Sequence, residues 1–309
     1  MTERGPIVCA TDLSPSGAEA VEIASRMAAA TSSALQLVTV GGIPPDAVGA
    51  PKTEAERVYR ERLERRYDAA SNALDKERVR ALSWGPHATA TVLGGRAWEA
   101  IVEHARAAQA SLIVVGPHGH EGPRSSTRRD LTEWILGSTA DRILRHAPCP
   151  VLVGPRGDGH APPIGGATWL IAVDFSEPAR AALKLALKLS KACKAKLVAL
   201  HVTHDPILRL DPAGEEEPFP PLDDVAKQMA EQKRAELIGL VKGELGTPIE
   251  VEVAVGDPAH EIASHARTLD AHMIVMGTHG RTGLSHFLLG STAERTLRLS
   301  SVPILCVRA

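Results

Sequence analysis

Aromatic residues are scarce in this chain, at 3% of its 309 residues. The interior of any folded domain must therefore be built from the aliphatic side chains that dominate its 44% hydrophobic fraction. No apolar run approaches the roughly 18 residues that would cross a membrane as a helix. The first twelve residues lack the apolar segment of a secretory signal, so we expect a cytoplasmic protein.

An excess of charge of either sign is also missing, because 35 Lys and Arg residues stand against 37 Asp and Glu. The formal net charge of −2 gives no electrostatic support for binding nucleic acid or an anionic membrane. Cysteines are few and isolated, with no CxxC spacing, at Cys9, Cys149, Cys193 and Cys306. This pattern favours buried thiols in a reducing compartment.

What the chain does contain is an internal repeat. Asp12 corresponds to Asp174 with an offset of 162 residues, and GPHG from Gly116 corresponds to GTHG from Gly277 with an offset of 161. LGSTADRILRHAPCPVL lies over LGSTAERTLRLSSVPIL with an offset of 153, and ten of the seventeen positions are identical. A period of about 160 residues is the size of a domain, which indicates a duplicated domain and not a solenoid.

The repeat and the composition between its copies predict the domain boundaries. Residues 155–167 are rich in Gly and Pro, which is typical of a linker. We therefore predict a first domain at 1–154 and a second domain at 168–309.

Short apolar runs alternate with helical segments in each copy. The predicted strands are 7–11, 35–40, 88–93, 112–115 and 151–153, then 170–174, 197–202, 249–255, 273–276 and 304–307. This alternation predicts a Rossmann-like α/β fold with two tandem, doubly wound, mostly parallel five-stranded sheets. Ser14 and Ser176, each followed by Pro within the first turn, are predicted helix N-caps.

A glycine-rich run follows the strand predicted at 273–276. Gly277, Gly280 and Gly290 precede Ser291-Thr292 and a predicted helix. Ligands bind beyond the carboxyl ends of such strands, where bare backbone approaches closely and the unpaired N–H groups of a helix start favour phosphate. The alternative is a tight turn with an ordinary N-cap. The strand-end position, the helix start and the acid ending the first strand favour the binding interpretation.

The spacing G-x2-G-x9-G-[ST], formed by Gly277, Gly280, Gly290 and Ser291, resembles the nucleotide-binding signature of the universal stress protein family. Neither GxxxxGK[ST] nor GxGxxG is present, which argues against a P-loop NTPase or a Rossmann dehydrogenase. The resemblance covers nearly the whole chain as a tandem pair. It implies an adenine nucleotide alpha hydrolase-like fold.

The ATP-binding branch of this family implies a role for each matching residue. Asp174 is expected beside the nucleoside, and Val202 is expected to meet adenine through its backbone. The glycines, Ser291 and the adjacent Thr292 are expected to hold ribose and phosphates. The implied ligand is ATP, with Mg²⁺ on its phosphates, and the implied partner is an adenine nucleotide.

The first copy departs from this signature. Its corresponding residues are Asp12, Val40, Gly116, Gly119, Gly137, Ser138 and Thr139. Seventeen residues separate Gly119 from Gly137, where the second copy has nine between its own pair. The extra residues either form a flap that brings Arg124, Arg128 or Arg129 to phosphates or push the loop away. We expect a weaker second site here.

Three other features suggest sites that we do not predict. His260 and His265 are five residues apart, so on a helix they diverge and cannot share a metal as an HExxH pair does. The histidines of the two glycine loops, His118 and His279, are interpreted as solvated in preference to contacting ligand. The basic residues of 57–66 are interleaved with Glu, which predicts a solvated helix face. We predict no metal site and no catalytic residues.

The sequence therefore predicts a stress-response regulator whose partner contacts change with bound nucleotide. No positioned general base or lysine is evident, so we expect at most weak ATP hydrolysis. The alternatives are a scaffold that binds no nucleotide and a slow ATPase. In the family the final strands often pair, so the resemblance implies that 151–153 and 304–307 form an intramolecular pseudo-dimer; a homo-oligomer of the chain is also expected.

Overall fold

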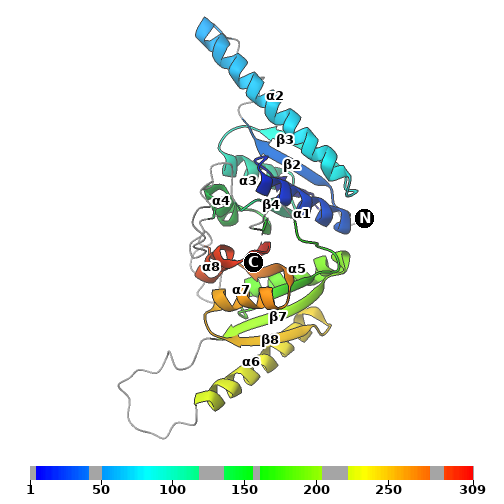
Figure 1. The fold of residues 1–309 in the computed structure, drawn as a ribbon, viewed down its shortest axis with the longest axis vertical. Helices are drawn as coiled ribbons and strands as arrows, with labels where there is room; N and C mark the ends of the chain where they lie inside the picture. The colour runs from blue at the N-terminus through cyan, green and yellow to red at the C-terminus, as the bar shows by residue number, and fades with distance from the viewer. Residues whose placement is uncertain are drawn as a thin grey trace, which may run out of the picture. The chain divides into compact units, whose positions relative to one another are not determined.

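The structure is a computed structural model that describes residues 5–41, 51–117, 136–155, 161–203, 222–278 and 289–308, without the side chains of 222–226. The chain divides into two compact units. The first comprises Met1–Gly165 and Ser301–Leu305, and the second comprises Gly166–Ser300 and Cys306–Ala309. Strands and helices alternate in both units (Figure 1).

The first unit is built on a sheet of five parallel strands in the order β3-β2-β1-β4-β5. Its strands are β1 (Ile7–Ala10), β2 (Leu35–Val40), β3 (Ala88–Leu93), β4 (Leu112–Val115) and β5 (Val151–Val153). Its helices are α1 (Pro15–Thr31), α2 (Glu54–Leu82), α3 (Ala97–Ala107) and α4 (Ser138–His146).

The second unit repeats this order with β9, β6, β7 and β8 as consecutive parallel neighbours and β10 beside β9. Its strands are β6 (Thr168–Ala172), β7 (Lys196–Thr203), β8 (Glu250–Val255), β9 (Ala271–Gly277) and the second half of β10 (Ile304–Val307), whose first two residues are counted with the first unit. Its helices are α5 (Glu177–Cys193), α6 (Leu222–Leu245), α7 (Pro258–Thr268) and α8 (Ser291–Leu299). The predicted α/β class and parallel sheets are confirmed.

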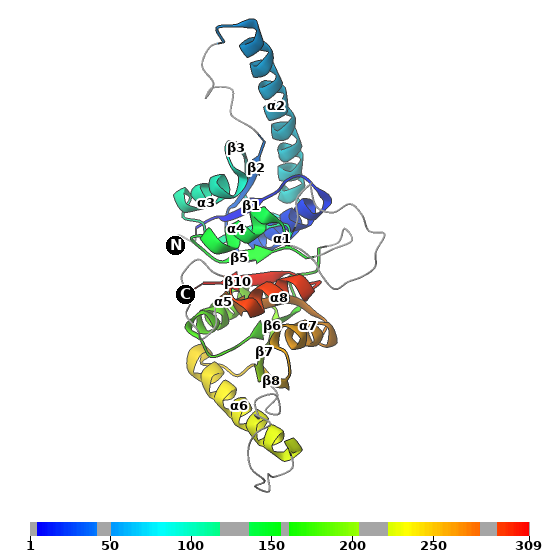
Figure 2. The ribbon, with the colours of Figure 1, turned by 90° about the vertical axis from the view of Figure 1, so that its left-hand side faces the viewer.

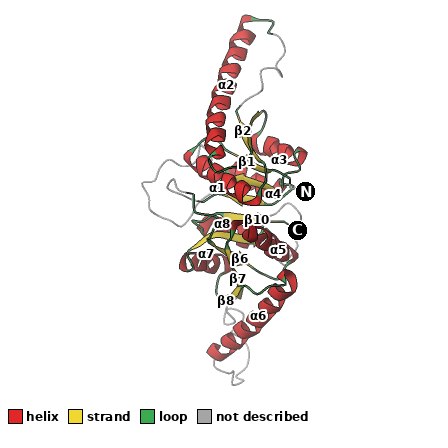
Figure 3. Ribbon diagram, turned by 90° about the vertical axis from the view of Figure 1, so that its right-hand side faces the viewer, coloured by secondary structure: helices red, strands yellow, loops and turns green. Residues whose placement is uncertain are grey.

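The strand order reverses at the same place in both units. The first strand of each unit, β1 or β6, lies between the second and the fourth. Figure 2 shows β1 next to β2 and β6 next to β7. Helices α1 and α2 pack together, as do α3 and α4, and the pairs α5–α6 and α7–α8 repeat this arrangement. Right-handed crossovers on either side of the reversal place the two pairs on opposite faces of each sheet (Figure 3). A crevice for ligands is expected at the carboxyl ends of the strands beside the reversal.

The cores are aliphatic, as the composition predicts. Among the buried hydrophobic residues of the described chain, Trp169 is the only aromatic one. The four cysteines are unpaired. Burial raises the pKa of Cys149 and Cys193 to about 11 and that of Cys306 to about 12. These thiols are therefore protonated at neutral pH and behave as small apolar side chains.

The first helix of each unit begins with the predicted serine cap. Ser14 Oγ accepts a hydrogen bond from Gly17 N (3.1 Å), and Ser176 Oγ accepts one from Ala179 N (3.3 Å). A proline occupies the first turn of both helices, where its missing N–H costs nothing. The predicted Ser N-cap followed by Pro is therefore confirmed at the start of both helices.

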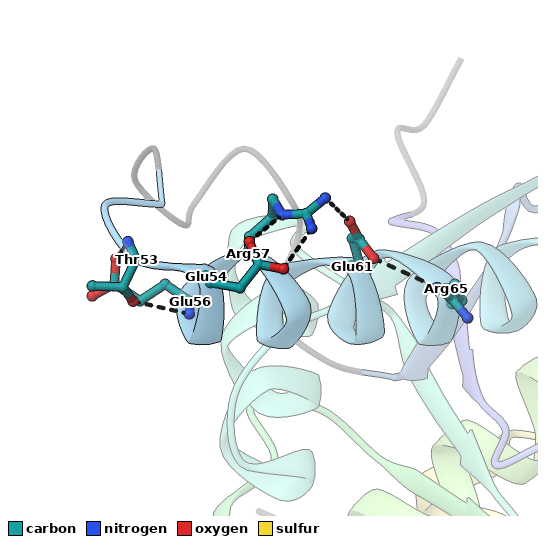
Figure 4. Close-up of polar contacts among 6 residues, drawn as sticks. All are labelled: Thr53, Glu54, Glu56, Arg57, Glu61 and Arg65. Carbon is teal, nitrogen blue, oxygen red and sulfur yellow. Dashed lines mark hydrogen bonds and ion pairs between the residues drawn. The ribbon is translucent and has the colours of Figure 1, made fainter.

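Helix α2 bears out the solvated face predicted for 57–66. A capping box of Thr53 and Glu56 starts the helix, and Arg57 then pairs with Glu54 (2.5 Å) and Glu61 (3.2 Å), as Figure 4 shows. The bond from Arg57 lowers the pKa of Glu54. These exposed pairs offset one another's charge along the helix.

Some predicted boundaries shift. The strand predicted at 170–174 is β6, which ends at Ala172, because the next residues leave the sheet to form the turn before α5. Strand β7 runs one residue past Val202, to Thr203. The end of the predicted linker is already packed in the second unit, since Gly166 N donates to Cys193 O (3.2 Å) and Ala167 O accepts from Lys196 N (2.8 Å).

Candidate functional site

The acid that follows the first strand holds the same turn in both units. Asp174 Oδ1 accepts from Ser176 N (3.0 Å) and Ser176 Oγ (2.5 Å). Asp12 Oδ1 accepts from Ser14 N (3.1 Å) and Ser14 Oγ (2.5 Å). Each carboxylate is half-buried. One oxygen of each predicted site acid therefore fixes the turn that places the carboxylate at the strand reversal.

Between the acid and the serine, the backbone adopts a left-handed conformation at a bulky residue. Phe175 has φ of 66° and Leu13 has φ of 64°. Such a conformation is an outlier for a large side chain and persists only where its surroundings enforce it. Here the conformation is enforced by the hydrogen bonds that join the preceding Asp to the following Ser. The two units therefore share a strained turn at the reversal point of the sheet.

The predicted valines lie at the ends of the second strands. Val40 pairs with Leu93 in β3, and Val202 pairs with Ala254 in β8. Both valines are half-buried. The neighbouring first strands end alongside, because Val173 N donates to Leu200 O (2.8 Å) in the second unit. The acid and the valine of the second unit therefore lie at adjacent strand ends on one edge of the sheet.

The first glycine of each loop is explained by packing. A Cβ at Gly277 would lie 2.8 Å from Pro178 Cβ and 3.0 Å from Ala179 N, closer than real side chains approach. A Cβ at Gly116 would meet Ser16 O at 3.3 Å. The absence of a side chain lets the loop begin directly against the first turn of α5 or α1. This contact brings the start of the loop to the turn held by the strand-end acid.

A main-chain hydrogen bond closes the base of each loop. Gly290 N donates to Thr278 O (2.7 Å), and Gly137 N donates to Pro117 O (3.0 Å). The helix that follows therefore starts beside the strand that precedes the loop in both units. The bond is present although the first loop is eight residues longer, so the extra residues leave the described ends of the loop in place.

Helices α8 and α4 start without a side-chain cap. Their N-cap residues are Gly290 (φ −63°, ψ 145°) and Gly137 (φ −58°, ψ 139°). Helix α3, with Arg96 as its N-cap residue, also lacks a side-chain cap, whereas α1, α2, α5 and α7 are capped by Ser14, Thr53, Ser176 and Asp257. No N-cap side chain occupies the amides at the starts of α8 and α4, and such amides together with the helix dipole favour an anion.

The exposure and charge near these helix starts are compatible with an anionic ligand. Ser291 and Ser138 are exposed, and Thr292 and Thr139 are half-buried. Each first turn also contains an acid, which by itself would repel phosphate. Glu294 is paired with Arg298 (2.5 Å), and Asp141 is held by Arg145 through two bonds of 2.9 and 3.0 Å. Most of the negative charge at the helix start is therefore offset within the same helix.

Several predicted residues lie outside the described residues. They are the middle glycines, the loop histidines and the basic residues of the first loop: Gly280, Gly119, His279, His118, Arg124, Arg128 and Arg129. In the second unit, the structure brings together the Asp174 turn, Gly277 and the α8 start. The first unit repeats this with Asp12, Gly116 and the α4 start.

An aromatic pair beside the Asp174 turn was missed from the sequence. The rings of His201 and Phe175 lie 4.7 Å apart at 60°, and His201 Nδ1 is 2.7 Å from Val173 O. Lys233 Nζ from α6 lies 5.5 Å from the centre of the Phe175 ring. The first unit has Leu13 and Thr39 at the corresponding positions. Comparing the two copies position by position is the signal that would have singled out this pair.

On α7, His265 contacts its own helix. His265 Nδ1 lies 2.9 Å from Glu261 O, one turn away, and is 3.6 Å from the Glu261 carboxylate. Within the described ranges, no three His, Cys, Asp or Glu side chains gather as metal ligands would. Of the helices that the structure describes, none combines the length and the apolar character needed to cross a membrane.

Known proteins resemble this chain in both sequence and fold. Universal stress protein Rv2005c of Mycobacterium tuberculosis is 29% identical over 202 residues, covering 65% of this chain and 62% of that protein. The match thus spans less than two thirds of that relative. Universal stress protein YxiE of Bacillus subtilis is 32% identical over 143 residues, covering 45% of this chain and 97% of the relative.

Solved structures match the chain over its full length. A universal stress protein of Archaeoglobus fulgidus covers 99% of this chain and 99% of its own, with 19% identity and a TM-score of 0.64. A candidate universal stress protein of Pseudomonas aeruginosa covers 99% of this chain and 94% of its own, with 22% identity and a TM-score of 0.64. At these identities the likeness concerns the fold alone.

The family comparison addresses each half of the chain separately. The model of the universal stress protein family matches residues 3–155 and again residues 168–308. These two matches cover nearly all of both copies of the internal repeat. The chain therefore belongs to the universal stress protein family and contains two of its domains in tandem.

Proposed function

We propose that the second unit binds ATP, with Mg²⁺ on its phosphates, and that the chain acts as a nucleotide-dependent stress-response regulator. The observation that carries this proposal is the hydrogen bond from Gly290 N to Thr278 O. It holds the uncapped start of α8 against the strand end beside the Asp174 turn. Amide N–H groups at such a position suit the negatively charged oxygens of a polyphosphate.

Each part of the site has a place in this proposal. Asp174 lies beside the nucleoside, the main chain at Val202 meets adenine, and the amides of Ser291 and Thr292 receive phosphate. Gly280 belongs to the same proposal through the family signature, as does Gly119 in the first unit. Mg²⁺, when bound, would neutralise phosphate charge that the amides alone leave uncompensated.

The chemistry of the loop favours holding ATP over hydrolysing it. The run GTHGRTGLSHFLLGST, from Gly277 to Thr292, contains no lysine and no carboxylate. Efficient phosphoryl transfer requires groups that orient the attacking water and stabilise charge in the transition state. We therefore infer that the output is a change in conformation or partner contacts, with at most slow hydrolysis.

The first unit is proposed as a weaker site for the same ligand. Its acid turn, uncapped helix start and loop-closing bond are counterparts of those in the second unit. What differs is the length of the segment between Pro117 and Gly137, which also contains three arginines and three acids where the second loop has one arginine and no acid.

The organisation of the whole chain is part of the same proposal. Its boundaries are 1–154 and 168–309 with a linker at 155–167, and the two domains form an intramolecular pseudo-dimer through β5 and β10. The compartment proposed is the cytoplasm.

Calorimetric titration of nucleotide-free protein with ATP and Mg²⁺, followed by a phosphate-release assay, tests the proposal. We expect saturable binding with little or no phosphate release. Gly290→Val, which adds bulk where α8 begins, is expected to abolish the binding. Phosphate release that Gly290→Val abolishes would favour the slow ATPase. Wild-type protein that binds no ATP at all would favour the nucleotide-free scaffold.

A further inference from the structure

The exposed large apolar side chains in the described part of the second unit lie on α6 and on β8. Met229 and Ile238 of α6 and Val255 of β8 are 38%, 44% and 39% exposed. Strand β8 is last in the strand order and pairs with β7. Its other side carries main-chain groups available to a further strand.

A groove of about 440 Å³ runs along this edge. It is lined by residues of α6, β8 and α7: Ala230, Glu231, Arg234, Val251, Glu252, Val253, His265, Thr268 and Leu269. Helix α6 packs with α5, and α7 packs with α8 on the opposite face of the sheet. A groove that touches both α6 and α7 therefore passes around the outer side of β8.

The walls of the groove carry charges of both signs. Glu231 and Arg234 are exposed on α6, Glu252 lies on β8, and none of the three forms an ion pair within the described residues. Their neighbours behave differently, because Lys233 pairs with Glu236 (2.6 Å) and Lys184 pairs with Glu244 (2.9 Å). A surface that offers unpaired acids and an unpaired arginine together is complementary to itself.

We propose that this groove is the contact surface for a second copy of the chain, with the two β8 edges pairing antiparallel about a two-fold axis. If the two-fold axis is perpendicular to the sheet, one residue of β8 lies on the axis and is directly opposite the same residue of the second copy. Placed at Val251 or Glu252, it would set Glu opposite Glu, which is unfavourable. Placed at Val253, it sets Glu252 opposite Ala254 and pairs Val251 with Val255 of the second copy.

The same axis gives the helices a reciprocal contact. Residues 230–234 of α6 line the groove together with 251–253 of β8, so they lie at the level of the axis. The two α6 helices then run antiparallel beside one another. Glu231 of each copy faces Arg234 of the other, which forms two equivalent ion pairs. Ile238 follows Arg234 by one helical turn on the same side of α6 and loses exposed apolar surface on contact.

Sedimentation equilibrium of the full chain without nucleotide tests this surface. We expect a reversible dimer that Arg234→Glu weakens about tenfold, because two ion pairs become two like-charge contacts. The double variant Glu231→Arg/Arg234→Glu restores the opposite charges and is expected to recover the wild-type affinity. Arg106→Glu, a reversal at an exposed position on α3 of the first unit, is the matched control and is expected to change nothing.

Hydrogen exchange gives the second readout. We expect amides of Glu250–Val255 to become protected as the protein concentration rises. A chain that stays monomeric at every concentration, or a dimer equally stable in Arg234→Glu, overturns the proposal. Because these measurements are made without nucleotide, their failure leaves the ATP proposal standing.

Discussion

The two units of this chain share a main-chain frame and differ in what is attached to it. Both have the Asp–Ser turn, the glycine against the first helix and the bond that closes the loop. The residues joined by that bond are twelve positions apart in the second unit and twenty in the first. Lengthening a closed loop by this ratio costs about 0.5 kcal/mol in chain entropy. The frame therefore tolerates the insertion.

The largest expected effect comes from making the two loops equal in length. Deleting eight residues between positions 118 and 135 should raise the ATP affinity of the first unit at least tenfold, because its helix start is already placed by the bond from Gly137 N. Calorimetric stoichiometry should rise from about one ATP per chain toward two.

A matched control separates loop length from loop charge. It replaces eight inserted residues with Gly and Ser and keeps the length, and its stoichiometry should stay near one. If the deletion variant also stays near one, the difference between the units lies elsewhere, with Phe175 and His201 as the first candidates.

The glycines that start the loops differ in how tightly they are packed. Gly277→Ala should destabilise the second unit by about 2 kcal/mol, because the new Cβ would overlap Pro178 and the backbone of Ala179. Gly116→Ala should cost less than about 0.5 kcal/mol, because its nearest contact is 3.3 Å. Urea unfolding measures both values, and hydrogen exchange assigns each loss to its unit. Equal losses in the two variants would contradict the packing account.

Sequence reasoning predicted the features that are local or repeated. The duplication, the parallel sheets and the caps at Ser14 and Ser176 follow from periodicity and from residue types at helix starts. The steric requirement for glycine at position 277 could not be predicted, because it comes from contact with Pro178, about a hundred residues earlier in the chain.

The contacts around the site were missed for the same reason. Phe175 lies in the turn after β6 and His201 lies in β7, and only the folded chain brings their rings together. The end of β6 was misplaced because Asp174, which reads as the last strand residue, instead bonds to Ser176.

The smallest expected effect concerns an ion pair at the start of α7, which has no equivalent at the start of α3 in the first unit. Asp257 caps α7 and pairs with Arg295 of α8 (2.7 Å), whereas the first unit has Arg96 at the corresponding position. Burial alone would raise the pKa of Asp257, but the bonds from Arg295 and from His260 N lower it. A carboxylate with a lowered folded-state pKa stabilises the fold above its unfolded pKa and loses this contribution as the pH falls through the folded one.

Asp257→Asn keeps the cap and removes the charge. We expect a loss of about 0.5 kcal/mol at pH 7 that fades as the pH falls below the unfolded-state pKa of aspartate, about 3.9, and through the lowered folded-state pKa, measured by urea unfolding across this range. Arg106→Ala, at an exposed position on α3 of the first unit, is the control and should show no such pH dependence. A loss for Asp257→Asn that is the same at every pH would show that the cap geometry, and not the charge, had been disturbed.

The most direct test of the central claim is an ATP titration of a matched pair of variants. Ser291→Glu and Ser138→Glu each place a carboxylate at an exposed helix start, where it suits the helix dipole but competes with phosphate. The account predicts that Ser291→Glu weakens the tight ATP site at least thirtyfold and that Ser138→Glu leaves it within about twofold. Unchanged affinity in Ser291→Glu, or loss of the tight site in Ser138→Glu, would contradict it.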